Sequence, residues 1–137
     1  MVNSQGITNP VWVRWFDAMS GVYDDVRQIP DKIFTVDTTL TTADFGKTIT
    51  FDCTSFDLEC TLMPVTTKDL YCWIKIFRRG LNRLTINAPE GVRIEYSKEG
   101  GKVWCLETLR YAANLTLMLV TATQFGITGA TGIWYVQ

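Results

Sequence analysis

The sequence predicts a mainly β fold, in which one N-terminal amphipathic helix precedes an antiparallel β-sandwich or barrel-like domain. Two observations lead to this prediction. Apolar residues recur at helical spacing before Pro30 and at a spacing of about two residues after it. Short runs rich in β-branched and aromatic residues then follow at intervals of about ten residues, separated by turn-forming residues. We therefore divide the 137 residues into an N-terminal arm with its helix, residues 1–30, and an all-β domain, residues 31–137.

The N-terminal helix is predicted for residues 9–29. Asn9 is a favourable helix cap, and Pro10 fits the first helical position because its missing N–H is not needed there. Apolar residues then recur in steps of three and four, which is a heptad pattern. This apolar stripe consists of Trp12, Trp15, Met19, Val22, Val26 and Ile29, with Phe16 and Tyr23 beside it. Pro30 ends the helix, and residues 1–8 are expected to form an extended arm.

A helix of this length is marginal in water, so its apolar stripe must be covered by another surface. Two interpretations remain open. The stripe packs against the chain's own β-domain, or it packs against copies of itself or into a groove of a larger partner. The spacing favours self-association, because a helix lying on a sheet drifts toward a period of about 3.6 residues. The candidate interface and attachment residues are Trp12, Trp15, Phe16, Met19, Val22, Tyr23 and Val26.

The all-β domain is predicted as a series of eight or nine short strands. In chain order, the runs with strand character span residues 32–41, 47–53, 58–63, 70–77, 83–88, 92–97, 102–107, 114–122 and 132–137. Ile49, Phe51 and Cys53 alternate with polar residues, which predicts a strand with one buried face. Residues 70–77 are apolar except for Lys75, so we expect that strand to be buried on both faces.

Turn-forming residues separate these runs. They are Pro64 and the segments RRGLN, APEG, KEGGK and TGATG. Residues 41–48 are expected to hold one helical turn or a tight turn in which Gly46 adopts a positive φ, and residues 106–116 a short turn. The regular alternation of strands and helices that characterises doubly wound folds is missing, which favours an all-β architecture.

The composition argues against several classes of function. Thirteen basic and 14 acidic residues give a net charge of −1, whereas a dedicated nucleic-acid binder carries a basic stripe. Histidine, the commonest general base and metal ligand, is absent, so we expect no enzymatic activity, no cofactor and no metal. Cys53, Cys60, Cys72 and Cys105 lie in apolar runs and are expected to be free buried thiols. The longest apolar run, residues 115–120, is too short to span a membrane.

Two groups of residues are candidates for contacts at the surface. Arg78, Arg79 and Arg83 surround Gly80, either as a loop that binds phosphate, carboxylate or a partner, or as an ordinary charged hairpin tip. Six aromatic residues are either core residues of their strands or a sugar-stacking platform of the kind found in carbohydrate-binding modules. These are Tyr71, Trp73, Tyr96, Trp104, Trp134 and Tyr135.

Several stretches of the chain carry a resemblance to a known group of proteins. Residues 35–53, TVDTTLTTADFGKTITFDC, followed by LTINAP at 84–89 and a short closing strand GIWYVQ at 132–137, resemble a pattern of tailed-bacteriophage virion proteins. The opening ITNPVWVRWFDAM, residues 7–19, is similar to the N-terminus of small phage structural proteins.

This resemblance implies a non-enzymatic tail or head-appendage component, commonly a homotrimer, that is assembled in the host bacterial cytoplasm and located in the virion. The N-terminal segment would attach it to other virion proteins, such as a portal, adaptor, tail or capsid protein, and the β-domain would project. The alternative from a different class of function is a carbohydrate- or receptor-binding β-module that uses surface aromatic residues to bind a host glycan. Neither interpretation involves a membrane or specific nucleic acid.

Overall fold

The structure is a computed structural model that describes residues 30–105 and 112–137. The predicted helix at residues 9–29, with all seven candidate interface residues from Trp12 to Val26, therefore lies outside the described residues. The same holds for most of the turn predicted within residues 106–116.

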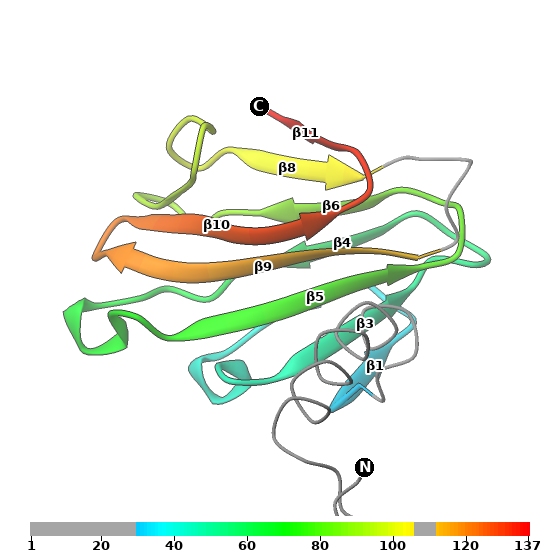
Figure 1. The fold of residues 1–137 in the computed structure, drawn as a ribbon, viewed down its shortest axis with the longest axis horizontal. Helices are drawn as coiled ribbons and strands as arrows, with labels where there is room; N and C mark the ends of the chain where they lie inside the picture. Colours follow the sequence, from blue (N-terminus) through cyan, green and yellow to red (C-terminus); the bar gives the residue numbers. More distant parts are fainter. Residues whose placement is uncertain (1–29, 106–111) are drawn as a thin grey trace, which may run out of the picture.

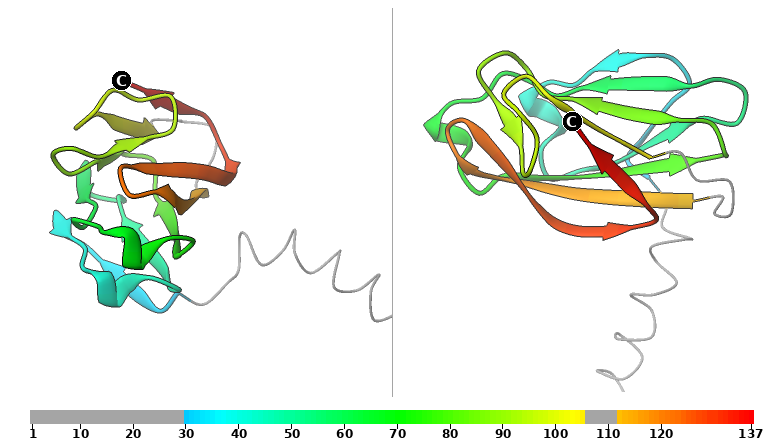
Figure 2. Two further views of the ribbon diagram at one scale, coloured as in Figure 1. Left: turned by 90° about the vertical axis from the view of Figure 1, so that its left-hand side faces the viewer. Right: turned by 90° about the horizontal axis from the view of Figure 1, so that it is seen from above.

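The described chain forms eleven strands in two sheets that lie as two layers (Figures 1 and 2). The strands are β1 (Lys32–Phe34), β2 (Thr38–Thr39), β3 (Thr48–Asp52), β4 (Leu58–Thr61), β5 (Trp73–Arg79), β6 (Leu84–Asn87), β7 (Arg93–Ile94), β8 (Lys102–Cys105), β9 (Ala112–Thr121), β10 (Gln124–Thr131) and β11 (Trp134–Val136). Two short 3₁₀ turns, η1 (Thr42–Asp44) and η2 (Thr67–Asp69), precede β3 and β5. The six-stranded sheet has the order β1-β3-β5-β9-β10-β7, and the five-stranded sheet has the order β11-β8-β6-β4-β2. A mainly β fold is thus confirmed.

Both sheets are mixed, so the expectation of an antiparallel sandwich is wrong. The chain passes to the opposite sheet after every strand except β9, which forms a hairpin with β10. Consecutive strands therefore seldom pair, and β1, β3 and β5 run parallel in one sheet, as do β2, β4 and β6 in the other. Antiparallel pairing is found at β5-β9, β9-β10, β6-β8 and β8-β11. Evenly spaced turn signals predict where a strand ends, but they do not say which sheet the chain enters next.

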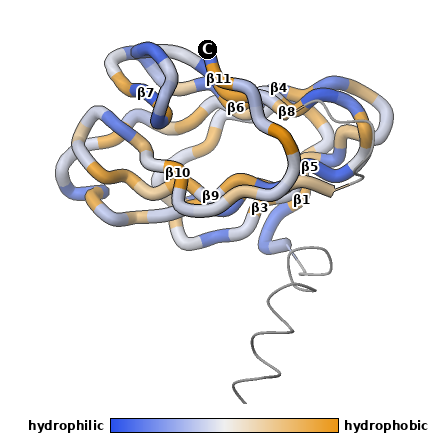
Figure 3. Tube along the Cα trace, turned by 45° about the horizontal axis from the view of Figure 1, so that its top comes forward, coloured by the Kyte–Doolittle hydropathy of each residue, from blue (hydrophilic) through white to orange (hydrophobic). Residues whose placement is uncertain are grey.

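The core lies between the two sheets and follows the alternation that the sequence predicts. Ile49, Phe51 and Cys53 are fully buried, as are Cys60 and Leu62. Hydrophobic and hydrophilic residues alternate along the strands of both sheets (Figure 3). Residues 70–77, which include most of β5, were predicted to be buried on both faces, and this prediction is wrong. Trp73 is exposed on the outer face of the six-stranded sheet, and Lys75 on the same face is half-buried.

Local sequence patterns predict the turn before β3 but not strand β10. The helical turn expected within residues 41–48 is present as η1, and Gly46 has a φ of +77°. Strand β10 was not predicted, because its glycines at 126 and 129 read as breakers and the segment TGATG read as a turn. The backbone accommodates them with irregular pairing to β9 near Ile127.

Asp44 links the first strand to the turn before β3. Its carboxylate accepts a hydrogen bond from Lys32 Nζ at 2.5 Å and another from the backbone N–H of Thr41 at 2.9 Å. Burial raises the pKa of Asp44, but the hydrogen bonds from Lys32 and Thr41 lower it more, so that the pKa lies below its usual value. Because the unfolded state then binds more protons, this contribution to stability is full above the ordinary carboxyl pKa and is lost as the pH falls through the folded value.

We expect Asp44→Asn to lower the free energy of unfolding at pH 7 by about 1–2 kcal/mol, since charge-assisted hydrogen bonds are lost in a buried position. The matched control is Asp69→Asn, because Asp69 caps η2 in the same way through Thr66 N at 2.9 Å but is less buried, with a cost of about 1 kcal/mol or less. Urea unfolding at pH 7 and near pH 3 measures both. A loss for Asp44→Asn that is unchanged at acid pH would contradict the assignment.

Candidate functional site

The three arginines predicted to share one loop are separated by the fold. Arg78 lies on the inner face of β5, is 0% exposed, and its Nη1 donates to the carbonyl of Asn82 at 3.4 Å. Arg79 is on the outer face, where its Nη2 donates to the Asp52 carboxylate at 3.0 Å. Arg83 follows the crossing to the other sheet, just before β6. Arg78 is therefore not available for a surface contact, and the expected basic loop does not form.

The six aromatic candidates are also dispersed, and most of them are not core residues. Tyr71 and Trp73 are exposed near the start of β5, and Tyr96 is exposed after β7. Trp134 is half-buried against the core, and its indole N–H donates to the carbonyl of Thr131 at 3.0 Å. The prediction that these aromatic residues lie in the core is therefore wrong for Tyr71, Trp73 and Tyr96.

Trp104 and Tyr135 form a ring pair on the five-stranded sheet. They are register partners of the antiparallel β8-β11 pair, and their ring centroids lie 5.7 Å apart at an interplanar angle of 23°. Cys105 and Val103, which flank Trp104, are fully buried, so the ring pair lies on the outer face. The guanidinium carbon of Arg83 lies 5.9 Å from the centroid of Trp104, within reach of a cation–π interaction. We call Arg83, Trp104 and Tyr135 the aromatic stack.

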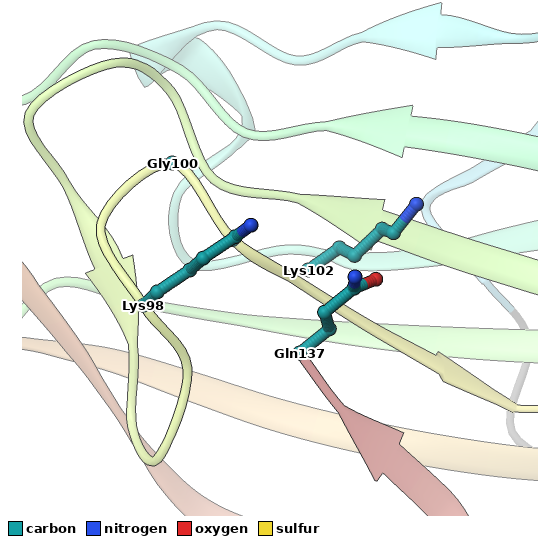
Figure 4. Close-up of a pocket in the computed structure, with 5 residues that line it drawn as sticks. Lys98, Gly100, Lys102 and Gln137 are labelled. Atoms are coloured by element: carbon teal, nitrogen blue, oxygen red, sulfur yellow. The ribbon is translucent and has the colours of Figure 1, made fainter.

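A basic pocket lies next to the aromatic stack. It has a volume of about 200 Å³ and is lined by Lys98, Gly100, Gly101, Lys102 and Gln137 (Figure 4). The main chains of Lys102 and Gln137 exchange two hydrogen bonds, of 3.1 and 2.8 Å, which fix the two strands at this position. Lys102 precedes Trp104 by two residues and Gln137 follows Tyr135 by two, so the pocket and the stack occupy the same face.

The tight turn at residues 97–101 builds one wall of this pocket. Gly101 N–H donates to the carbonyl of Lys98 at 2.9 Å, and Ser97 Oγ donates to the same carbonyl at 2.9 Å. A Cβ on Gly101 would lie 2.3 Å from the carbonyl oxygen of Gln137, so glycine is required where the turn meets the end of β11. The sequence KEGGK indicated a turn, but only the β8-β11 pairing places its two lysines beside Gln137.

A second pocket, of about 230 Å³, lies between the loop before β7 and the β9-β10 hairpin. It is lined by Gly91, Arg93, Glu99 and Thr123. Arg93 Nε already donates to Gln124 Oε1 at 2.9 Å, and Glu99 brings an opposite charge. This pocket combines both charges and has no aromatic wall, so it is a poorer candidate for binding than the basic pocket.

The cysteine thiols are mostly buried, and burial lowers the reactivity of two of them. Cys53, Cys60 and Cys105 are buried, Cys72 is half-buried, and none of the four forms a disulfide. Burial raises the pKa of the Cys53 thiol to about 12, with a smaller opposing effect from Arg78, and burial also raises the pKa of Cys60. Thiols of this kind are poor nucleophiles at neutral pH.

Neither a metal cluster nor a membrane-spanning helix is found in the described chain. Within residues 30–105 and 112–137, no three His, Cys, Asp or Glu residues are grouped so that they could hold a metal ion. No helix among these residues is long and apolar enough to cross a membrane.

Comparison with known proteins does not assign the chain to a family. No protein-family model matches the sequence, and no curated protein matches it. The resemblance to virion proteins therefore stays a prediction from the motifs.

Proposed function

We propose that this chain is a non-enzymatic structural protein of a tailed-bacteriophage virion, a tail or head-appendage component that assembles as a homotrimer. The proposal has two supports. The sequence motifs at residues 7–19 and 35–53 resemble those of such proteins. In addition, apolar side chains are exposed where the N-terminal segment joins the β-domain, and this observation carries the proposal.

Strand β1 is the edge strand of the six-stranded sheet, and Ile33 on it and Val36 just after it are exposed. The outer-face row that begins with Ile33 continues through Thr50, Phe77 and Asn114, which are uncharged but buried, so Ile33 is the exposed member of this row. Charged residues lie on either side of this row: Lys75, whose Nζ lies 5.2 Å from the ring centroid of Phe77, and the ion pair of Asp52 with Arg79. Exposed apolar side chains on and beside an edge strand, here Ile33 and Val36, suit contact with another polypeptide.

The N-terminal segment is the proposed attachment element, through the stripe from Trp12 to Val26. It would join copies of the chain and dock them to a portal, adaptor, tail or capsid protein. Assembly in the host cytoplasm, a reducing compartment, is compatible with four cysteines that form no disulfide.

We expect the double substitution Trp12→Ala and Trp15→Ala to abolish trimer formation and incorporation into particles while the β-domain stays folded. Buried aromatic anchors of an interface are typically worth about 2 kcal/mol or more each. Light scattering of the full chain measures the oligomer, circular dichroism measures the β-domain, and immunodetection in purified particles measures incorporation.

The control for this experiment is Tyr71→Ala with Tyr96→Ala, which removes two exposed aromatic rings of the β-domain. This variant should assemble normally. A wild-type chain that scatters as a 15.6 kDa monomer, or a tryptophan double variant that still assembles, would count against the proposal.

A second candidate function is favoured by the aromatic stack. An exposed aromatic ring on the outer face of a sheet, here Tyr135 beside the half-buried Trp104, suits a glycan-binding β-module, because sugar rings pack their apolar faces on aromatic rings. This function is compatible with the first, since an appendage of a virion can also bind a host-surface glycan.

A further inference from the structure

We infer that the outer face of β8 and β11 is a binding site for an anionic saccharide, in which Tyr135, supported by Trp104, packs against a sugar ring and Lys98 and Lys102 bind its carboxylate or phosphate. This inference rests on the second candidate function above and specifies the site and the class of ligand.

Tyr135 supplies the accessible ring of the site. Its side chain is 48% exposed, and β11 is the edge strand of the five-stranded sheet, so no described strand lies beyond it (Figure 1). Trp104 is half-buried between Tyr135 and the guanidinium of Arg83. These contacts hold both rings in place before any ligand arrives, which lowers the entropic cost of binding.

Lys98 and Lys102 supply the positive charge. They approach the pocket from different elements, the turn at 97–101 and strand β8, and the amide of Gln137 lies beside Lys102 (Figure 4). Among the described residues, neither lysine forms an ion pair within 4.0 Å. Because both lysines line the pocket, an anion bound there would be attracted by two positive charges.

The acidic residues of this face are held away from the pocket. Glu59 lies on β4, two strands or about 10 Å from β8, and its carboxylate accepts a hydrogen bond from Asn87 Nδ2 at 2.9 Å. Asp57, at the other end of the face, accepts a hydrogen bond from the backbone N–H of Arg83 at 2.9 Å. The end of the face near Gln137 thus carries Lys98 and Lys102, while Glu99 of the same turn lines the second pocket.

The spacing of the two parts fits a monosaccharide that carries an acidic group. Two residues along a strand cover about 7 Å, which is the separation expected between the Trp104–Tyr135 row and the Lys102–Gln137 row. A sugar ring on the aromatic rings would then place a carboxylate or phosphate substituent at the lysines. Single-stranded nucleic acid also offers rings and anions, but it requires a basic groove along several nucleotides, and this face carries acidic residues beyond β6.

The experiment is a calorimetric titration of the full chain with four probes. These are polygalacturonate for the carboxylate, poly(glycerol phosphate) for the phosphate, dextran as the neutral polysaccharide, and a single-stranded oligothymidylate. We expect binding to at least one of the two anionic polymers, and binding of dextran at least tenfold weaker. The polymer that binds identifies the anion.

Two variants test the two parts of the site, and each has a matched control. Tyr135→Ala and the double variant Lys98→Gln with Lys102→Gln should each weaken binding of the anionic polymer at least tenfold. Tyr96→Ala and Lys68→Gln, which change an exposed tyrosine and an exposed lysine elsewhere, should leave it unchanged. Circular dichroism confirms that all four variants are folded.

The outcomes separate this inference from the function on which it rests. Equal binding of dextran and the anionic polymers, or unchanged binding by the lysine double variant, would overturn the anionic site and leave a glycan-binding module. Binding of no saccharide would overturn both. Tighter binding of the oligothymidylate, lost in the same variants, would overturn the saccharide assignment.

Discussion

Gly80→Ala is expected to destabilise the β-domain by about 4 kcal/mol, a large fraction of the roughly 5–15 kcal/mol by which an ordinary domain is stable. Gly80 has a φ of +93°, which alanine adopts only at a cost. A Cβ there would lie 2.6 Å from the carbonyl carbon of Cys53 and 2.6 Å from the backbone nitrogen of Thr54. Both contacts are with backbone atoms, so no side chain can move aside to relieve them.

The matched control is Gly46→Ala. Gly46 also has a positive φ, +77°, but a Cβ there meets no atom within 4 Å. Gly46→Ala should lower the free energy of unfolding by about 1 kcal/mol, the cost of holding alanine at a positive φ. Urea unfolding followed by circular dichroism measures both variants, and the difference between them isolates the steric contact at Cys53. Similar losses for the two variants would show that the turn at Gly80 moves away from residues 53 and 54.

The position of Gly80 shows why the turn was predictable and its contact was not. The segment RRGLN combines a glycine with two arginines and an asparagine, which indicates a turn. The close approach arises because β3 and β5 are parallel neighbours, so that the residues after both strands meet at the same end of the sheet. Cys53 N–H donates to the carbonyl of Arg79 at 2.7 Å there. Pairing between strands separated by a crossing is a property of the tertiary structure.

The same reasoning applies to the sheets as a whole. The alternation at Ile49, Phe51 and Cys53 and the turn at Gly46 depend on local sequence, and both predictions are confirmed. The parallel order of the strands depends on which sheet each crossing enters, and local patterns carry no information about it. Strand β10 was missed because glycine and threonine lower its strand signal, whereas pairing with the long, apolar β9 stabilises it.

The basic pocket was not predictable for a related reason. Lys98 and Lys102 are separated by a turn, and Gln137 is 35 positions further along the chain. Only the antiparallel pairing of β8 with β11 brings them together beside Trp104 and Tyr135. The sequence does place Lys102 and Trp104 two residues apart in a predicted strand, and this is the one signal from which a shared face could have been inferred.

Arg78 and Arg79 are adjacent, but their substitution by alanine should lower the free energy of unfolding by very different amounts. Arg78 is the largest fully buried side chain among residues 30–105 and 112–137, and its Nη1 donates to the carbonyl of Asn82. Arg78→Ala empties a large volume in the core and removes that donor, so we expect a loss of about 3 kcal/mol or more. Arg78→Met keeps most of the volume without the buried charge and should lose clearly less.

Arg79→Ala is the matched control, because Arg79 is on the opposite face of the same strand. Its ion pair with Asp52 is partly exposed, with side chains 42% and 25% accessible, and such pairs contribute about 1 kcal/mol or less. Urea unfolding of the three variants at neutral pH gives the comparison. Equal losses at 78 and 79 would mean that the guanidinium of Arg78 is not held in the core. The two side chains point to opposite faces because successive residues of a strand alternate, so the phase of β5 alone decides which arginine the core must accommodate.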